Sequence, residues 1–231
     1  VYLCQENLTD ALACAQEVID SKRFEFMNDS INNVYAYRNL SYIEKMARHE
    51  YVSSLYVYDL KEGRSDLFFK NLASCECVIA EGRKASIYSG MGQDLDIRSK
   101  NWFETPAGSA TEYVNKYMRG TQIPLLKLSE MYLIAAEGWM EDDPGHAAEL
   151  LQTFKQARTQ KEVVSQEVTE DVIMREIRKE FIGEGVIFLT YKRLHHDIWG
   201  NTSEDQVKAD NNVFVFPIPE DEIEYGNRTQ N

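Results

Sequence analysis

The segment Pro124–Glu137 reads PLLKLSEMYLIAAE, and it decides the fold that we expect. Its apolar side chains recur three and four positions apart, a spacing that gathers them on one face of an α-helix. The residues of this stripe are Leu125, Leu128, Met131, Tyr132, Ala135 and Ala136. The sequence therefore predicts an amphipathic helix over this segment, with the stripe buried against neighbouring helices.

A second helix is predicted directly downstream. The run Asp142–Gly145 (DDPG) interrupts the first helix, and Asp143 is placed to cap the next one with Pro144 at its first position. Apolar residues then resume the helical spacing at Ala147, Leu150, Leu151, Phe154 and Ala157. Together the two helices span about 34 residues, which is the length of a tetratricopeptide repeat.

The remaining C-terminal residues predict two more helices and a tail. Thr169 and the two acidic residues after it are typical of a helix start, and Gly183 marks the end or a kink of that helix. The next helix is predicted at Val186–His195. Asn211–Pro219 contains two prolines, which forbid a helix there, and we expect an acidic turn at Glu220–Tyr225.

Upstream of the opening segment, residues 1–21 also have helical spacing, and Ala11, Ala13 and Ala15 permit close approach of a neighbouring helix. Residues 22–120 are irregular, with a short helix expected at Ser41–Tyr51 and a strand at Tyr51–Leu60. The first residues lack the features of a signal peptide and lead straight into a helix. We therefore interpret the chain as starting inside a longer protein.

These patterns predict helical hairpins with long irregular loops, which we interpret as one domain over residues 1–231. Within it, residues 1–26 form a repeat helix, 27–123 a loop-rich region, and 124–231 a helical region with a C-terminal tail. Long loops in a compact domain usually carry function. We therefore expect any ligand-binding residues in the loop-rich region.

Composition excludes several classes of function. The chain has 231 residues, of which 43% are hydrophobic, and a net charge of −13. It therefore has the apolar residues for a sizeable core, and its charge repels a nucleic-acid backbone. No apolar run is long enough to cross a bilayer as a helix. Cys75 and Cys77 lack the spacing of a zinc site, and His195 and His196 diverge on a helix, so no metal or cofactor is expected.

Glu180 and Glu184 lie four residues apart, on one face of a predicted helix. Paired carboxylates can hydrolyse glycosidic bonds, so a glycosidase is one alternative. Basic residues lie nearby in the sequence at Arg178, Lys179, Lys192 and Arg193. We favour a structural ion-pair network, in which the same basic residues also pair with Glu130 and Glu137. No catalytic residue is therefore assigned, and the protein is not expected to be an enzyme.

The candidate ligand-binding residues are Trp102, Tyr88, Tyr113 and Asn101, all in the loop-rich region. Aromatic rings pack against the apolar faces of sugars, and neighbouring amides bind the hydroxyl groups. The alternative is that these aromatic side chains anchor the loops to the core, because large aromatic residues are usually well buried. Of the four residues, Trp102 is the likeliest stacking residue on this pattern.

Several segments, in matching order, resemble the SusD/RagB family of outer-membrane nutrient-binding lipoproteins. They are Ala11–Phe26, Asp96-Ile-Arg98, Pro124–Glu137, Ala147–Arg158, Arg178–Gly185 and Phe216–Ile223. The match is densest over residues 124–231 and thin over 27–120. Family members are usually about twice as long, so the resemblance implies that this chain is a C-terminal part.

The resemblance also implies a fold and a function. It implies an all-α fold of tetratricopeptide-like helix pairs with a loop-rich ligand face. It also implies a parent protein that is lipid-anchored at the outer-membrane surface by a segment outside this chain. It implies capture of a glycan or oligosaccharide and its delivery to a TonB-dependent, SusC-like transporter. The signature residues would then be structural: Lys127, Glu130, Glu137, Glu180, Glu184 and Arg193. The alternative function is a helical-repeat scaffold that binds only other proteins.

Overall fold

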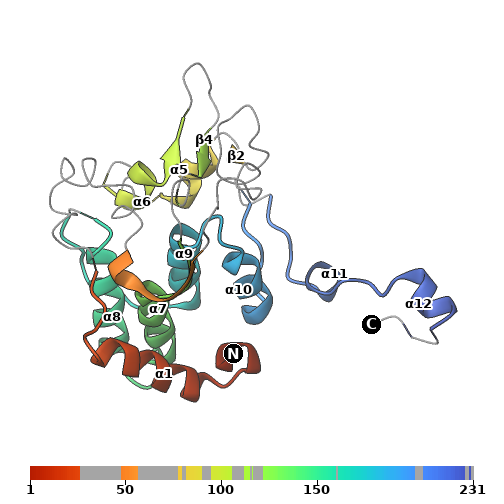
Figure 1. Ribbon diagram of the computed structural model, residues 1–231, viewed down its shortest axis with the longest axis horizontal. Helices are drawn as coiled ribbons and strands as arrows, with labels where there is room; N and C mark the ends of the chain where they lie inside the picture. Colours follow the sequence, from red (N-terminus) through yellow and green to blue (C-terminus); the bar gives the residue numbers. More distant parts are fainter. Residues whose placement is uncertain are drawn as a thin grey trace. The chain divides into compact units, whose positions relative to one another are not determined.

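The structure is a computed structural model, shown in Figure 1. It describes residues 1–26, 48–56, 78–79, 82–89, 95–105, 112–114, 116, 122–159, 161–200, 205–226 and 229. The chain divides into two compact units, Val1–Glu184 and Gly185–Asn231, where the sequence predicts one domain. Among the described residues, no helix is long and apolar enough to cross a membrane. Cys75, Cys77 and most of the expected helix Ser41–Tyr51 lie outside the described residues.

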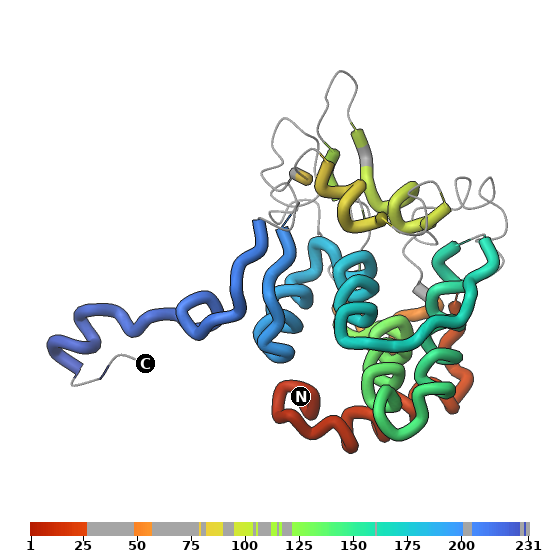
Figure 2. Tube along the Cα trace, turned by 180° about the vertical axis from the view of Figure 1, so that it is seen from behind, coloured from red at the N-terminus to blue at the C-terminus, as the bar shows by residue number. Residues whose placement is uncertain are grey.

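The first unit begins with a short 3-10 turn, η1 (Tyr2–Gln5), followed by helix α1 (Leu8–Asp20). The side chain of Asn7 caps α1 by accepting a hydrogen bond from the backbone N–H of Asp10. Ala11 and Ala15 are buried, as their small size predicts for a close helix contact, whereas Ala13 is exposed. Helix α1 packs on helix α7, which lies beside it in Figure 2.

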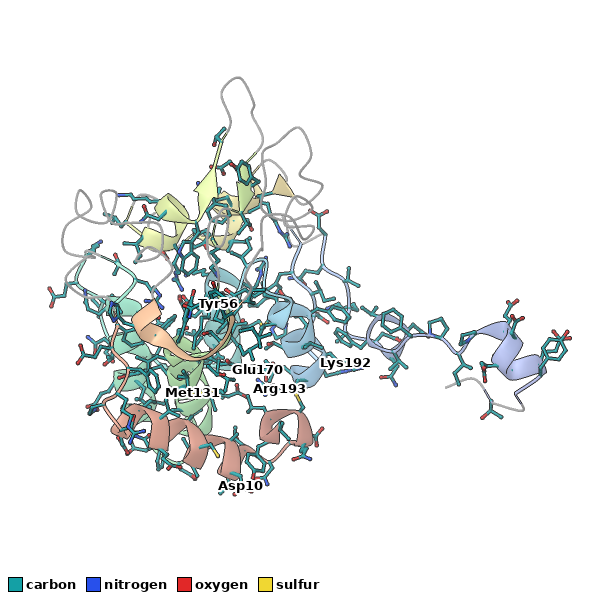
Figure 3. The ribbon with its side chains drawn as sticks, in the orientation of Figure 1. Asp10, Tyr56, Met131, Glu170, Lys192 and Arg193 are labelled. Atoms are coloured by element: carbon teal, nitrogen blue, oxygen red, sulfur yellow. The ribbon has the colours of Figure 1, made fainter. Side chains whose placement is uncertain are left out.

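Helices α7 (Leu128–Gly138) and α8 (Pro144–Gln156) form the predicted hairpin. Asp143 caps α8 as predicted, accepting a hydrogen bond from the backbone N–H of His146, and Pro144 is the first residue of the helix. Met131, labelled in Figure 3, is a buried residue of α7. The most deeply buried apolar residues of the hairpin are Leu133, Ala135, Ala136, Ala147, Leu151 and Phe154.

The start of α7 differs from the prediction. Residues Gln122–Lys127 form strand β5, which pairs antiparallel with β1 (Tyr51–Tyr56), so Leu125 lies outside the helix and is 53% exposed. The pairing with β1 accounts for the difference, because it keeps the backbone extended as far as Lys127 and the helix begins only at Leu128. The strand prediction for Tyr51–Leu60 is confirmed over Tyr51–Tyr56. A 3-10 turn, η3 (Arg48–Glu50), leads into β1.

Helix α9 (Glu170–Glu180) begins as predicted, with the Thr169 hydroxyl accepting a hydrogen bond from the backbone N–H of Val172. The helix ends at Glu180, before the predicted stop at Gly183. Gly183 has a φ of 78°, a conformation that favours glycine, in the turn that follows. Helix α9 packs against α7 and therefore belongs to the helical body of the first unit.

A second small sheet lies in the region predicted to be loops. Its strand order is β2 (Val78–Ile79), β4 (Glu112–Val114) and β3 (Phe103–Glu104), with both pairs antiparallel. Two short helices accompany it, α5 (Arg83–Ile87) and α6 (Ile97–Asn101). The helix-rich architecture is confirmed, but the fold is not all-α, because both small sheets belong to it. The tetratricopeptide-like repeat stays a prediction.

The second unit contains helix α10 (Val186–Leu194), which matches the predicted helix and ends at His195, whose φ is 48°. A helical turn, α11 (Asn211–Phe214), follows where the two prolines led us to expect no helix. The turn ends before Pro217, so the prolines limit the helix without preventing it. The predicted acidic turn is the short helix α12 (Glu220–Glu224).

Candidate ligand-binding site

Three carboxylates follow one another along a face of α9 and the turn after it. Glu176 and Glu180 are four residues apart, so their side chains lie on the same side of α9. Glu184 lies in the turn that follows the helix. Glu176 and Glu180 are buried and Glu184 is nearly so. We call these three residues the carboxylate ridge. Each of them contacts basic side chains that come from other parts of the first unit or from α9 itself.

Glu176 pairs with Arg98 from α6 and with Lys179 from its own helix. The Oε2 atom of Glu176 lies 2.9 Å from Arg98 Nη2, and its Oε1 atom lies 2.8 Å from Lys179 Nζ. Arg98 also binds Asp96, with its Nη2 atom 2.8 Å from Asp96 Oδ2. Arg98 is completely buried, so its charge depends on these carboxylates for stabilisation.

Glu180 is the centre of the ridge. Its Oε1 atom lies 3.0 Å from Arg158 Nη2, and its Oε2 atom lies 3.3 Å from Arg98 Nη1. Arg158 reaches in turn to Glu50 in η3. One carboxylate therefore receives hydrogen bonds from α6 and from the segment after α8, which joins the loop-rich region to the helical body.

Glu184 lies at the end of the ridge nearest the small sheet β2–β4–β3 and binds two lysines. Its Oε1 atom accepts hydrogen bonds from Lys116 and from Lys127, the latter at 2.9 Å. Lys116 also donates to the backbone carbonyl of Glu180. The sequence predicts neither lysine as a partner of Glu184, although the family resemblance implies that Lys127 is structural.

The ridge carboxylates are held in their charged form. Burial by itself raises the pKa of a carboxyl group, but Arg98 and Lys179 outweigh it and lower the pKa of Glu176 to about 2. Burial also raises the pKa of Glu180, but Arg158, Lys127 and Arg98 lower it more strongly. The pKa of Glu180 therefore lies well below its ordinary value. A glycosidase acid needs a raised pKa. The ion-pair interpretation of Glu180 and Glu184 is therefore confirmed.

One of the basic residues that were predicted to pair with Glu130 and Glu137 has another partner. Lys179 pairs with Glu176, not with Glu130 or Glu137. Burial raises the pKa of Glu130, and Lys127 is the basic residue with the largest opposing effect. Lys127 is therefore shared among the acidic residues near the start of α7 and the end of α9.

Tyr88 and Tyr113, two of the predicted ligand-binding residues, are core residues of the loop-rich region. Tyr88 is 1% exposed and Tyr113 is 3% exposed. The Tyr88 ring packs edge-on against Phe103 at a centroid distance of 5.7 Å, and its hydroxyl donates to the backbone carbonyl of Lys179 at 2.9 Å. Neither ring presents an open face to a ligand, so both residues correspond to the alternative in which aromatic side chains anchor the loops.

Trp102 and Asn101 are half-buried, and they lie at the C-terminal end of α6. Asp96 caps this short helix by accepting a hydrogen bond from the backbone N–H of Arg98. The Trp102 ring packs against the cluster of Tyr88, Phe103 and Val114. The prediction that Trp102 and Asn101 bind a ligand therefore stays open, and their position on α6 ties them to the ridge through Arg98.

Lys116 is the residue of this site that sequence reasoning missed. Its Nζ atom lies 4.0 Å from the centre of the Trp102 ring, while its side chain is 4% exposed. It is 64 residues from Glu180 and 68 residues from Glu184 in the sequence. A separation of this length leaves no periodic signal, so the sequence gives no indication that Lys116 joins Trp102 to the ridge.

Comparison with known proteins supplies the fold. No protein-family model and no curated protein matches the chain. A SusD superfamily protein from Bacteroides thetaiotaomicron matches with a TM-score of 0.72 at 21% identity, and one from Bacteroides vulgatus with 0.65 at 21%. Surface glycan-binding protein A from Bacteroides thetaiotaomicron, in complex with laminarihexaose, matches with 0.65 at 14%. The chain has the fold of the SusD superfamily.

The SusD-like fold extends over the whole chain but is only part of those longer proteins. The three structures cover 100%, 99% and 100% of this chain. The chain spans only 57%, 55% and 61% of the lengths of those three proteins. The resemblance that the sequence motifs indicate is therefore confirmed at the level of the SusD-like fold.

Proposed function

We propose that this protein is a glycan-binding protein that captures oligosaccharides at the outer-membrane surface for a TonB-dependent, SusC-like transporter. The SusD-like fold supports this function, and one structural neighbour is a surface glycan-binding protein with a bound laminarihexaose. The proposal places the helical stack of α1, α7 and α8 on the side of the protein partner and the loop-rich region on the side of the glycan.

The observation that carries the proposal is the half-buried Trp102 beside Asn101 at the end of α6. A tryptophan that is anchored by the core and still partly exposed offers a rigid apolar face for a sugar ring. The neighbouring Asn101 amide has both donor and acceptor groups for sugar hydroxyls. Stacking of this kind binds and orients a glycan without cleaving it.

A binding function fits the carboxylates better than a hydrolase does. Glycosidases pair a protonated acid with a charged carboxylate. The ridge instead keeps Glu180 and Glu184 charged and surrounded by Lys116, Lys127 and Arg158. We therefore propose that the protein is not an enzyme, and we expect no reducing sugar to be released from any glycan that it binds.

Tryptophan fluorescence tests the binding proposal. The chain has three tryptophans, so the double variant Trp139→Phe/Trp199→Phe leaves Trp102 as the reporter. Titration with maltohexaose, laminarihexaose, xylohexaose and mannohexaose should change its emission for at least one of them. Trp102→Ala should weaken that binding by about two- to tenfold, because stacking contributes on the order of 0.5–1.5 kcal/mol. Undiminished affinity in a folded Trp102→Ala variant would refute the site.

A protein-binding scaffold is the second candidate, and the sheet β1–β5 favours it. Leu55 and Ile123 are direct cross-strand partners, and they are 52% and 37% exposed. Leu125 and Tyr56, the latter labelled in Figure 3, are 53% and 67% exposed. Apolar residues that gather on an exposed sheet suit contact with another protein.

Co-purification tests the transporter and scaffold proposals together. The parent protein should be tagged, extracted from membranes in mild detergent, and examined for a barrel transporter at near-equal amount. Glu149→Lys, at a 77% exposed side chain on α8, should reduce recovery of the transporter while glycan binding is retained. Leu125→Lys, on the sheet β1–β5, serves as the control for added charge and should reduce recovery only of proteins that bind the sheet. Recovery of other proteins without a transporter would favour the scaffold.

A further inference from the structure

A buried ammonium group lies directly against the ring that we propose to bind the glycan. Lys116 Nζ is 4.0 Å from the centroid of Trp102. The lysine cannot move away freely, because it donates hydrogen bonds to Glu184 and to the backbone carbonyl of Glu180. Its side chain is 4% exposed. Trp102 therefore has a fixed positive charge on one face.

This contact determines what the other part of the ring can accept. The negative face of an aromatic ring attracts a cation, and Lys116 already occupies that position on one side. A cationic ligand stacked on the opposite side would lie roughly 8 Å from Lys116 Nζ, given a similar ring distance on both sides. At that separation, and in a partly buried site, repulsion weakens binding by about fivefold.

Whereas Lys116 repels cations locally, the overall negative charge of the chain repels anions. With a net charge of −13, the protein repels polyanionic ligands at long range. Glu184, on the carboxylate ridge, partly offsets the charge of Lys116 through its ion pair with the ammonium group. The local cation and the global negative charge therefore leave neutral sugars as the class that neither field opposes.

We propose that Lys116 is a specificity-determining residue that excludes cationic sugars from Trp102 and so selects neutral glycans. This inference rests on the proposed glycan site. It assigns to Lys116 a role beyond holding the loop-rich region to α9, since a purely structural lysine would not change the preference of the site for the charge of its ligand.

Collisional quenching tests the charge effect without a glycan. In Trp139→Phe/Trp199→Phe protein, Trp102 emission should be quenched weakly by caesium ions relative to neutral acrylamide. Lys116→Met should raise the caesium-to-acrylamide ratio by about twofold, allowing for salt screening, whereas Lys116→Arg should keep it low. If Lys116→Met does not fold, Lys116→Gln provides the neutral side chain. An unchanged ratio in a folded neutral variant would overturn the inference.

The unmodified lysine offers an independent measurement through pH. Burial lowers the pKa of Lys116 to about 8. The charge of Glu184 opposes this shift, Lys127 adds to it, and Glu180 opposes it. Raising the pH through this value removes the ammonium charge facing Trp102, so caesium quenching should increase near pH 8 in protein that retains Lys116. The increase should be absent in Lys116→Met. The same increase in both proteins would contradict the role of Lys116.

A matched pair of glycans separates this inference from the proposed function. Laminarihexaose and maltohexaose should each bind about fivefold more tightly than their quaternary trimethylammonium derivatives at pH 7. Lys116→Met should abolish that difference while the neutral sugars still bind. If the neutral sugars bind but the difference persists in Lys116→Met, the charge selection is wrong and the glycan site stands. If Trp102→Ala leaves all binding unchanged, the glycan site itself is wrong.

Discussion

Arg158 and Glu50 form a bidentate ion pair although 108 residues separate them in the sequence. Arg158 Nη1 lies 3.0 Å from Glu50 Oε1, and Nη2 lies 2.6 Å from Oε2. Both side chains are at most 3% exposed. Because Arg158 also binds Glu180, its guanidinium joins η3, the end of α8 and the carboxylate ridge in one buried network.

Removal of Arg158 should strongly destabilise the protein. In Arg158→Met, Glu50 and Glu180 keep their buried charges but lose their shared partner, so the free energy of unfolding should fall by about 3–5 kcal/mol. Urea denaturation measures this change. The control is Arg175→Ala on α9, whose side chain is 60% exposed and 3.7 Å from Asp171; it should cost less than about 1 kcal/mol. Equal effects of the two substitutions would contradict the network.

Acid should weaken the first unit through the ridge. Burial raises the pKa of the Glu176 carboxyl group, but Arg98 and Lys179 have the larger, opposite effect. The pKa is therefore about 2 in the folded protein, against an ordinary value of 4.5. The unfolded chain therefore binds this proton first as the pH falls. The resulting stabilisation is complete above about pH 4.5 and is lost between there and pH 2, amounting to about 3 kcal/mol. Urea denaturation at pH 7, 5 and 3 should record the loss, and Glu176→Gln should flatten it.

Gly138 permits the close contact between α7 and α1. A Cβ atom at this position would lie 3.0 Å from Leu12 Cβ and 3.1 Å from Leu12 Cδ1. We expect Gly138→Ala to lower stability by about 1 kcal/mol, because crowding outweighs the gain in helix propensity. Gly145→Ala on α8, where the nearest atom is Asp143 Oδ1 at 3.4 Å, should be neutral or stabilising. Thermal unfolding of both variants distinguishes crowding from propensity.

Local chemistry explains which parts of the fold the sequence predicts well. Thr169 and Asp143 mark their helix starts because a cap depends only on the next three residues. The β5 segment is mispredicted because Leu125 and Leu128 satisfy helical spacing by chance, although Leu125 lies in a strand. The proline does not decide between strand and helix, because proline is also tolerated in the first turn of a helix. The pairing with β1, which is distant in the sequence, decides it.

The candidate site is less predictable, because its contacts join distant segments. Glu180 and Glu184 are recognisable as an ion-pair network from their spacing and the basic residues nearby. Their actual partners, Arg158 and Lys116, come from elsewhere in the chain. The sequence likewise marks both Tyr88 and Trp102 as candidate ligand-binding residues, with Trp102 favoured for stacking, and their burial distinguishes them in the structure.

Tyr88 and Trp102 should therefore respond in opposite ways to substitution. The Tyr88 hydroxyl donates to the carbonyl of Lys179, which is one of the last four carbonyls of α9 and lacks a partner within the helix. Tyr88→Phe leaves that buried carbonyl without this donor and should reduce the free energy of unfolding by about 1–2 kcal/mol. The affinity for a bound hexasaccharide should not change, because the ring packing against Phe103 remains.

Trp102→Ala should give the reverse pattern, with a loss of hexasaccharide affinity that exceeds its effect on folding. Trp102 packs at the edge of the Tyr88 cluster and is half-buried, so its removal leaves a shallow, solvent-accessible gap, whereas the sugar loses its stacking face. Urea denaturation and isothermal titration calorimetry on the same preparations measure both quantities. If Tyr88→Phe weakened sugar binding as much as Trp102→Ala while leaving stability unchanged, Tyr88 would be the ligand contact and the buried arrangement of its ring would not be the binding form.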